Sequence, residues 1–416
     1  MDHKNELSAS KGASRLYTRS FFEVFAAAAL FMTGVSLQFH FGQYVAFLGY
    51  EVGTLGRILS VSMIGTLLIR LFIGQWVDRF GCRPVWLVGA VFSTLAVGSM
   101  QFAQQVWLIT LLRLVGTMAM AAVMTTVAVF AAQIAPQGRR AESIGTIGLA
   151  GFLGMVIGPT LGDLIFSSTT GSVVPYRIFF SASALCSFLA GFLVLFISMP
   201  MDHAPSRTSG HQPFRNIRSQ LSLIRRHWPG MILLIGIIFA LAFCIQSMYL
   251  ERLAEARGFK NIKLFFLCYC PTAMILRLVF RRLPQQIGRT RTVLLGLGFM
   301  AAGQVLLVGV AAQSGLVLPG ILMGAGHCFI FPSMIDLAAE RLPSNDRGTG
   351  TALILGAGDI GMLIGYGTLG ELIDTVGFDL TLKLLAATVL VSAVLLAVAR
   401  RKDVFFRVAK VNGLRC

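Results

Sequence analysis

Two stretches of sequence decide the fold, LIRLFIGQWVDRFG at Leu68–Gly81 and ILRLVFRRLPQQIG at Ile275–Gly288. The second repeats the first at an offset of 207 positions (277 minus 70), which places Arg70 over Arg277 and Gly81 over Gly288. The same offset continues without a gap and sets Gly154, Met155, Ile157 and Gly158 over Gly361, Met362, Ile364 and Gly365. Two halves in register predict parallel structural repeats with a site where they meet.

The composition predicts that the chain lies in a membrane. The sequence is 56% hydrophobic and only 13% charged over 416 residues, which leaves too few polar side chains to cover a water-soluble protein of this size. At about 20 residues per crossing, apolar runs predict twelve helices, six in each half, over 21–47, 53–77, 85–104, 107–134, 143–166, 177–199, 229–250, 262–280, 293–313, 316–339, 350–373 and 381–399.

The net charge of +17 has a topological explanation. If the N-terminus is cytoplasmic, most of the 35 lysines and arginines fall in the cytoplasmic loops and tails, as the positive-inside rule requires. The basic residues are spread over short loops and form no stripe with stacking aromatics, so the pattern argues against nucleic acid as a partner. Both termini are therefore expected in the cytoplasm.

Cysteines and histidines predict neither a disulfide framework nor a metal site. None of the seven cysteines has a zinc-like spacing with histidines, and Cys268 and Cys270 are two apart on a helix and so point to different faces. The first apolar run is too long for a cleavable signal peptide and is interpreted as the first spanning helix. No cofactor is expected.

The longest polar stretch divides the chain into five parts. Residues 1–19 are predicted to be a cytoplasmic tail, 20–200 a six-helix bundle, 201–227 a cytoplasmic linker, 228–400 a second six-helix bundle, and 401–416 a second cytoplasmic tail.

The segment GQWVDRFGCRP at Gly74–Pro84 resembles the signature between the second and third helices of the major facilitator superfamily. Its matching positions are Gly74, Asp78, Arg79, Gly81 and Arg83. The resemblance covers nearly the whole chain and implies twelve helices in two bundles related by pseudo-two-fold symmetry. It also implies that Asp78 contacts the N-terminus of the eleventh helix and latches the halves in an outward-facing state, which suits the positive partial charge of that end. The alternative is a solvated loop charge. The second copy lacks the acid, because Gln285 and Gln286 replace Asp78 and Arg79.

The segment GMVIGPTLGD at Gly154–Asp163 resembles the fifth-helix motif of antiporters in this superfamily, with Asp163 in place of the last glycine. Glycines three and four apart share a helix face and allow close helix approach, and a proline inside a helix makes a kink. We expect a helix pivot at Gly154, Gly158, Pro159 and Gly162, and this motif favours export. Packing alone would explain each glycine taken singly.

Two ionisable residues stand near the middle of predicted spans. His327 lies about eleven residues into the tenth helix and Asp359 about ten residues into the eleventh, roughly 15 Å deep at helical rise. Ionisable groups at that depth are costly unless paired or hydrated, and both groups can exchange protons near neutral pH. The pair is hypothesised to couple protons to transport. The alternative is that His327 bonds a carbonyl and Asp359 caps a helix break.

Other polar residues inside the spans are candidates for substrate binding or gating: Arg113, Arg70, Arg277, Gln38, His40 and Gln43. Arg113 matches poorly the functional arginine that many drug/proton antiporters of the superfamily carry, and it can equally snorkel outward. Arg70 and Arg277 can bind an anionic group or cap carbonyls. The resemblance implies that the first helix, with Gln38, His40 and Gln43, lines the central cavity, although these side chains can also face a wet vestibule.

The sequence therefore predicts a monomeric secondary transporter in a plasma membrane of the bacterial inner-membrane type. It is expected to move a small organic solute by alternating access, with proton-coupled export favoured over proton-linked uptake of a metabolite or anion. No phosphate-binding loop for a nucleotide is present. A sensor or lipid-handling protein on the same fold is the alternative of another class, and no constellation of residues indicates an enzyme. The expected partners are the solute, protons and membrane lipids.

Overall fold

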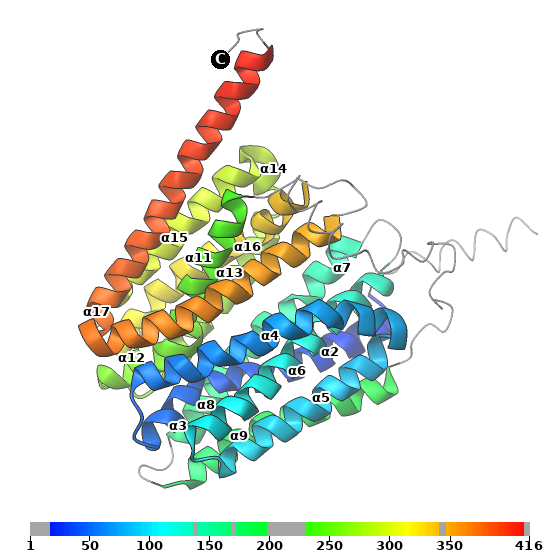
Figure 1. Ribbon diagram of the computed structural model, residues 1–416, viewed down its shortest axis with the longest axis vertical. Helices are drawn as coiled ribbons and strands as arrows, with labels where there is room; N and C mark the ends of the chain where they lie inside the picture. Colours follow the sequence, from blue (N-terminus) through cyan, green and yellow to red (C-terminus); the bar gives the residue numbers. More distant parts are fainter. Residues whose placement is uncertain (1–16, 136–139, 168–171, 198–229, 341–346, 412–416) are drawn as a thin grey trace, which may run out of the picture. The chain divides into compact units, whose positions relative to one another are not determined.

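The computed structural model describes residues 17–135, 140–167, 172–197, 230–340 and 347–411 (Figure 1). Within these ranges the chain is helical and forms no β-strand. The described residues fall into two compact units, the first within Met1–Phe39 and Ile64–His211 and the second within His40–Met63 and Gln212–Cys416. The all-α prediction is confirmed. The linker predicted at 201–227 lies outside the described residues, and the predicted domain boundaries remain predictions.

The first unit is a bundle of long apolar helices. Its elements are α2 (Arg19–Leu37), the part of α4 (Val52–Phe80) from Ile64 onward, α5 (Cys82–Ser99), η2 (Met100–Phe102), α6 (Val106–Gln133), α7 (Arg140–Ile147), α8 (Leu149–Phe166) and α9 (Val174–Phe196). The 3₁₀ turn η1 (Gln38–His40) follows α2 directly, and the chain passes from the first unit to the second within it.

The second unit contains the rest of the described chain. Its elements are α3 (Phe41–Phe47), the first part of α4 up to Met63, α11 (Met231–Cys244), the π-helix η3 (Ile245–Tyr249), α12 (Leu250–Ala256), α13 (Lys263–Val279), α14 (Leu283–Ile287), α15 (Arg289–Val308), η4 (Gln313–Leu316), α16 (Val317–Glu340) and α17 (Arg347–Val411).

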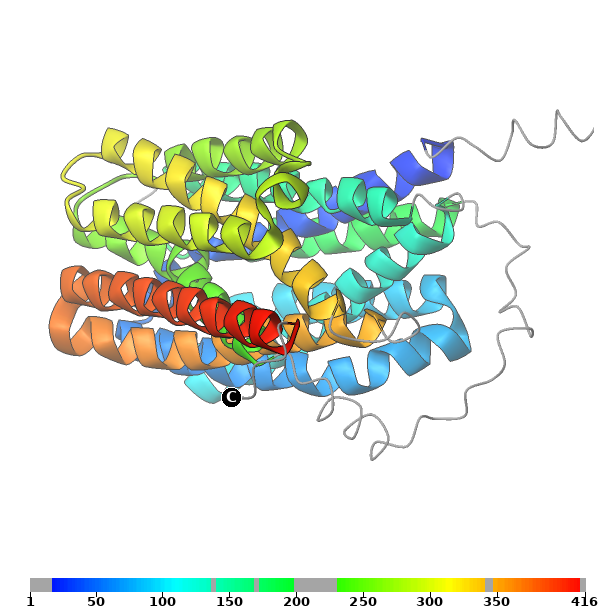
Figure 2. The same cartoon turned by 90° about the horizontal axis from the view of Figure 1, so that it is seen from above.

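Ten helical segments in the described part of the chain are long and apolar enough to span a membrane. The difference from the twelve predicted runs has two causes. The run at 262–280 becomes α13, which has 17 residues. The runs at 350–373 and 381–399 both lie on α17, which is interrupted by the non-helical conformation of Gly377 (φ 79°, ψ 170°). The ribbon of α17 changes direction partway along in Figures 1 and 2.

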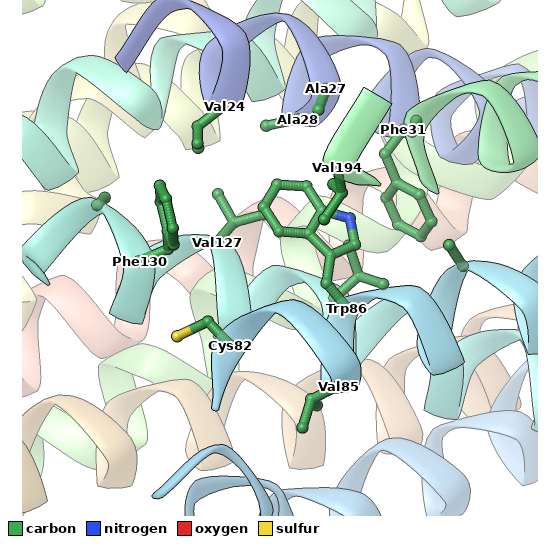
Figure 3. Close-up of a cluster of buried hydrophobic side chains, with 14 of the residues drawn as sticks. Val24, Ala27, Ala28, Phe31, Cys82, Val85, Trp86, Val127, Phe130 and Val194 are labelled. Atoms are coloured by element: carbon green, nitrogen blue, oxygen red, sulfur yellow. The ribbon is translucent and has the colours of Figure 1, made fainter. Parts of the chain in front are cut away.

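The core of the first unit is built around a single large side chain. Trp86 on α5 is 1% exposed and lies among side chains from α2, α6 and α9 (Figure 3). The facing surface of α2 contributes the small residues Ala27 and Ala28. These small side chains leave room for the indole ring, since protein interiors are packed to near-crystalline density.

Glycines carry the closest helix contacts in both units, at positions related by the sequence repeat. A Cβ added at Gly154 on α8 would lie 2.6 Å from the backbone of Met32 on α2. A Cβ at Gly361 on α17, 207 positions after Gly154, would overlap the backbone of Ile237 on α11. The same glycine pattern therefore packs α8 on α2 and α17 on α11, as small-residue interfaces between membrane helices require.

The repeat also extends to backbone irregularities. Gly81 (φ 84°) and Gly288 (φ 90°) both adopt a left-handed conformation immediately before α5 and α15, so each half uses glycine at the same turn. The π-helix η3 begins at Ile245, and subtracting the offset of 207 gives Gln38, the first residue of η1. Both halves therefore interrupt their first long helix at one register position.

A polar seam joins the first part of α4 to α17 inside the second unit. The Asp374 carboxylate accepts a hydrogen bond from the backbone N–H of Gly53 at 2.5 Å, and Ser60 donates to the Leu363 carbonyl at 2.7 Å. Arg57 and Glu371 pair at 2.8 Å, but both side chains are more than half exposed, so this ion pair contributes little. The bond of Asp374 to the N-terminus of α4 is the stronger contribution.

Candidate functional site

A buried chain of hydrogen bonds crosses the first unit. Arg113 on α6 donates from Nη1 to Oε1 of Gln38 at 2.8 Å, and Nε2 of Gln38 donates to Oγ of Ser183 on α9 at 2.9 Å. Ser183 in turn donates to the Gly34 carbonyl at 2.7 Å. We call Arg113, Gln38 and Ser183 the first polar chain.

The structure decides between the two positions expected for the Arg113 side chain, which could face the interior or snorkel outward. Its side chain is 7% exposed and turns inward to Gln38, so it does not snorkel to the surface. A buried guanidinium requires acceptors for its donors, because desolvation of an uncompensated charge is costly. The first polar chain supplies one such acceptor and holds it in place through Ser183. Asp163 on α8 and Thr117 on α6 are buried as well.

The second unit contains a comparable chain. Nε2 of Gln246, inside η3, donates to the Tyr269 hydroxyl on α13 at 2.9 Å, and that hydroxyl is 2.5 Å from Nδ1 of His327 on α16. Gln246 and Tyr269 are fully buried and His327 is partly buried. We call Gln246, Tyr269 and His327 the second polar chain. If the phenol donates to Nδ1, protonation of that nitrogen requires the hydroxyl to reorient; if Nδ1 carries the proton and donates to the phenol oxygen, Nε2 can take up a second proton with the bond intact.

Aromatic rings surround the imidazole. The ring centroid of His327 lies 5.2 Å from that of Phe239, 5.8 Å from Phe243, 5.9 Å from Tyr269 and 5.6 Å from Phe331. Two of these rings belong to α11, and the others to α13 and α16. These edge and tilted ring contacts enclose the imidazole in apolar side chains.

The π-helix orients further polar groups. In a π-helix the hydrogen bonds join residues five apart, so a carbonyl near its start loses its ordinary α-helical partner. Nε2 of Gln304 on α15 lies 3.5 Å from the Ala242 carbonyl, at the limit of a hydrogen bond. Ser247 approaches the hydroxyl of Tyr366 on α17 at 3.2 Å, and Tyr249 donates to the Tyr366 carbonyl at 2.5 Å. The turn thereby connects α11 to both α15 and α17.

The remaining predicted site residues lie at several places. Asp359 is 6% exposed on α17, which packs against α16. Arg70 on α4 and Arg277 on α13 are half-buried. His40 is buried at the end of η1, and Gln43 is half-buried on α3. Their functional roles remain predictions.

The signature segment forms the turn from α4 to α5. Gly81 supplies the left-handed turn residue, and a Cβ at Gly74 would meet nothing within 4 Å in the described structure. Arg79 lies over the Phe80 ring at 5.3 Å, and Arg83 donates to the Leu195 carbonyl at the end of α9. The side chain of Asp78 lies outside the described residues, so the latch remains a prediction.

The predicted pivot is a close contact between helices. Pro159 lies inside α8, and Gly154, Gly158 and Gly162 are buried on that helix. Ser36 on α2 donates to the Gly154 carbonyl at 2.6 Å. This geometry describes tight packing at a proline-containing helix, and movement about it remains a prediction.

Sequence reasoning missed Gln246, Tyr269 and Ser183. The candidates named from the sequence were ionisable groups and the polar residues of the first helix, whereas Gln246 and Tyr269 belong to the second polar chain and Ser183 completes the first. A glutamine inside the run 229–250 was the available signal, because unsatisfied polar groups are as costly in lipid as in a protein core. Among the described residues, no cluster of three His, Cys, Asp or Glu is placed to hold a metal ion.

Long apolar helices with polar chains buried between them define a multi-pass, all-α membrane protein. The chain belongs to the Major Facilitator Superfamily, whose sequence profile matches residues 20–283 and 261–412. The overlapping matches agree with the internal repeat.

Two relatives have names that refer to drug resistance. The chain is 26% identical over 194 residues to Multidrug resistance protein 2 of Bacillus subtilis (strain 168), a match that spans 47% of each protein and so about half the length of that relative. It is 27% identical over 313 residues to the class G tetracycline resistance protein of Vibrio anguillarum, covering 71% of this chain and 74% of the relative.

Solved structures share the fold at low identity. A mutant of the nucleoside transporter NupG matches with a TM-score of 0.79 at 12% identity, over 91% of this chain and 99% of that one. The inward-open xylose transporter XylE from E. coli matches with a TM-score of 0.71 at 13% identity, over 90% and 94%. These likenesses establish the fold and leave the solute open.

Proposed function

We propose that this chain is a secondary active transporter that exports a small, flat organic solute by alternating access, driven by protons. The observation that carries the proposal is the second polar chain, in which an imidazole, hydrogen-bonded to a buried phenol, is enclosed by aromatic rings. Histidine is the side chain whose ordinary pKa is closest to physiological pH. Rings beside it provide a surface for an aromatic solute.

The direction is supported by two further observations. The relatives named above are multidrug and tetracycline resistance proteins, and the α8 segment resembles the antiporter motif. The proposed cycle protonates His327, or Asp359, from outside and releases the proton to the cytoplasm as the solute leaves. Arg113 and Gln38 are proposed to contact the solute from the first unit, and the Asp78 and Arg79 latch to hold the outward-facing state. The proposed location is the plasma membrane, with both termini in the cytoplasm.

The test uses inside-out membrane vesicles with an imposed pH gradient, acidic inside. Tetracycline, a fluoroquinolone and a lipophilic cationic dye serve as probes, and dequenching of a pH-sensitive dye reports proton release. We expect at least one probe to accumulate inside the vesicles and a protonophore to abolish its accumulation. His327→Gln and Asp359→Asn should each reduce proton-driven accumulation about tenfold or more, while downhill exchange persists, because general acid–base groups contribute effects of that order.

The matched control is Asp336→Asn. Asp336 also lies on α16 but is exposed and paired with Arg289 at 3.4 Å, so its loss should leave flux unchanged. Undiminished proton-driven flux in both test variants would remove the coupling proposal. Movement of a probe in the opposite direction would establish uptake, and binding of a probe without any flux would favour a sensor.

A further inference from the structure

The hydroxyl of Tyr269 lies within hydrogen-bond distance of two side chains. Nε2 of Gln246 donates to it at 2.9 Å, and Nδ1 of His327 lies 2.5 Å from it. Among the described residues the hydroxyl has no third hydrogen-bond partner. Gln246 and Tyr269 have no exposed surface, so solvent water cannot take the place of either partner. The direction of one bond therefore constrains the direction of the other.

The observed bond from Gln246 determines how the phenol uses its own proton. A phenol hydroxyl has a single proton to donate. Because the amide nitrogen of Gln246 already donates to the phenol oxygen, that proton is available only to Nδ1 of His327. A buried hydroxyl that donates to nothing is costly, which favours this arrangement. Nδ1 then accepts, and neutral His327 carries its own proton on Nε2.

Uptake of a proton by His327 must reverse both bonds. Since Nε2 already carries a proton, the second proton goes to Nδ1, which then donates to the phenol oxygen. The hydroxyl of Tyr269 turns toward Gln246 and requires an acceptor there. The side-chain oxygen of Gln246, Oε1, is buried and has no hydrogen-bond partner among the described residues. A half-turn of the amide exchanges its nitrogen and oxygen and brings this acceptor to the hydroxyl.

We propose that Gln246 is a positioning residue for the proton on His327 and that it acts through Tyr269. With its nitrogen toward the phenol, Gln246 holds neutral His327 as the Nε2–H tautomer. With its oxygen toward the phenol, it supports the imidazolium. The incoming proton forms an N–H bond at Nδ1, the hydroxyl turns and the amide rotates, and no other covalent bond forms or breaks. The inference rests on the proposed function, in which His327 takes up the transported proton.

The charged groups near the imidazole lie outside this chain of bonds. Arg277 on α13 acts on it electrostatically, and α11 presents two phenyl rings to it. Of the other helices packed against α16, α17 carries the buried Asp359, and α15 has its charged residues in the first turn, at Arg289 and Arg291. An uncharged replacement of Gln246 leaves all of these charges in place, so its effect on His327 reports the chain of bonds.

The test reads which ring nitrogen carries a proton. The histidines of the purified full chain are labelled with a heavy nitrogen isotope, and NMR spectra are recorded in nanodiscs over a pH series, without solute or a pH gradient. The chain has six histidines, and the spectrum of His327→Gln assigns the signals of His327. In the wild-type protein at alkaline pH we expect the proton on Nε2, with Nδ1 accepting a hydrogen bond.

Gln246→Met removes the acceptor that the protonated form needs and adds no charge. Protonation of Nδ1 should then require about a tenfold higher proton concentration, as an unsatisfied buried hydroxyl implies. In the Tyr269→Phe background the same substitution should have no effect, because no hydroxyl remains to be satisfied. Gln246→Glu retains an acceptor and should not need the additional acid.

Gln304→Met is the matched control. Gln304 is another fully buried glutamine of the second unit, and its amide lies at the Ala242 carbonyl on α11, away from Tyr269. Its replacement should leave the His327 signals unchanged. In the vesicle assay, Gln246→Met should need a more acidic interior for half-maximal accumulation.

Two results would overturn the proposal. One is a wild-type spectrum in which neutral His327 carries its proton on Nδ1. The other is an effect of Gln246→Met that persists in the Tyr269→Phe background or is matched by Gln304→Met. The spectra need no transport, so the expected spectra without proton-driven flux would support the role of Gln246 and remove only the coupling proposal.

Discussion

Arg257 shows how one side chain can close the end of a helix bundle. Its guanidinium donates to the carbonyls of Leu307, Val308 and Val310 at 2.5, 3.1 and 3.0 Å, and it pairs with Asp379 at 2.5 Å. The last carbonyls of α15 have no partner within their helix. Arg257 therefore satisfies them and connects α12, α15 and α17.

Replacing Arg257 by Gln should destabilise the protein by about 2 kcal/mol, because several charge-assisted hydrogen bonds are lost at once. The measurement is thermal or denaturant unfolding in detergent. Arg252→Gln is the matched control, since Arg252 pairs with the exposed Glu255 within one helix and should change stability by less than about 0.5 kcal/mol. Equal effects of the two variants would contradict this assignment.

Gln38 should contribute to the stability of the protein although its side chain is uncharged. Gln38→Leu removes the acceptor of Arg113 and the donor to Ser183. We expect a loss of about 1.5–3 kcal/mol in stability, the usual range for a hydrogen bond to a charged group. Unfolding of Gln38→Leu, of Arg113→Leu and of the double variant measures the coupling in a double-mutant cycle. A coupling energy near zero would show that the bond contributes nothing.

At the residue scale, Arg113 and Gln38 could be named from the sequence, but their direct hydrogen bond could not. The two residues are 75 positions apart, and only the packing of α2 against α6 and α9 brings them to 2.8 Å. The role of Tyr269 could not be predicted for a different reason. Its ring is as apolar as those of its neighbours, and its hydroxyl becomes significant only beside His327.

At the scale of elements, glycines at matching positions of the repeat allow close helix contacts in both units. Gly154→Ala and Gly361→Ala should each destabilise by about 1–3 kcal/mol, because the added methyl groups would overlap the backbones of α2 and α11. Gly298→Ala on α15 is the control, since a Cβ there meets nothing within 4 Å. A helical alanine in open space should stabilise by about 0.5–1 kcal/mol.

Unfolding measurements on the three purified variants provide the test. If Gly154→Ala behaves like Gly298→Ala, the close approach of α8 to α2 is not required for stability.

The helices themselves were largely predictable, because long apolar runs in lipid have few alternatives to helix. Their interruptions were less so. A glycine between two apolar runs can interrupt a helix, as Gly377 does in α17. In contrast, no residue of Ile245–Tyr249 indicates a π-helix. That turn depends on packing against Tyr366 and Gln304, which lie far away in sequence.

At the scale of the whole molecule, the charge distribution predicts the topology. A reporter fused after residue 200, or at the C-terminus, should lie in the cytoplasm. Green fluorescent protein fused there should fluoresce, and alkaline phosphatase should be inactive, because most basic residues fall on that side. A phosphatase fused after Gly49, between the first two predicted spans, is the control and should be active. The reverse pattern would invert the assigned orientation.

The paired irregular turns have a consequence for how a duplicated sequence can make an unsymmetrical interior. A 3₁₀ turn at Gln38–His40 winds its helix more tightly, and a π turn at Ile245–Tyr249 winds its helix more loosely. Beyond these points, residues that match in the alignment of the halves are rotated in opposite senses about their own axes. A repeated sequence can therefore place different side chains at matching positions of its two halves, because the helical pitch changes in opposite directions at these turns.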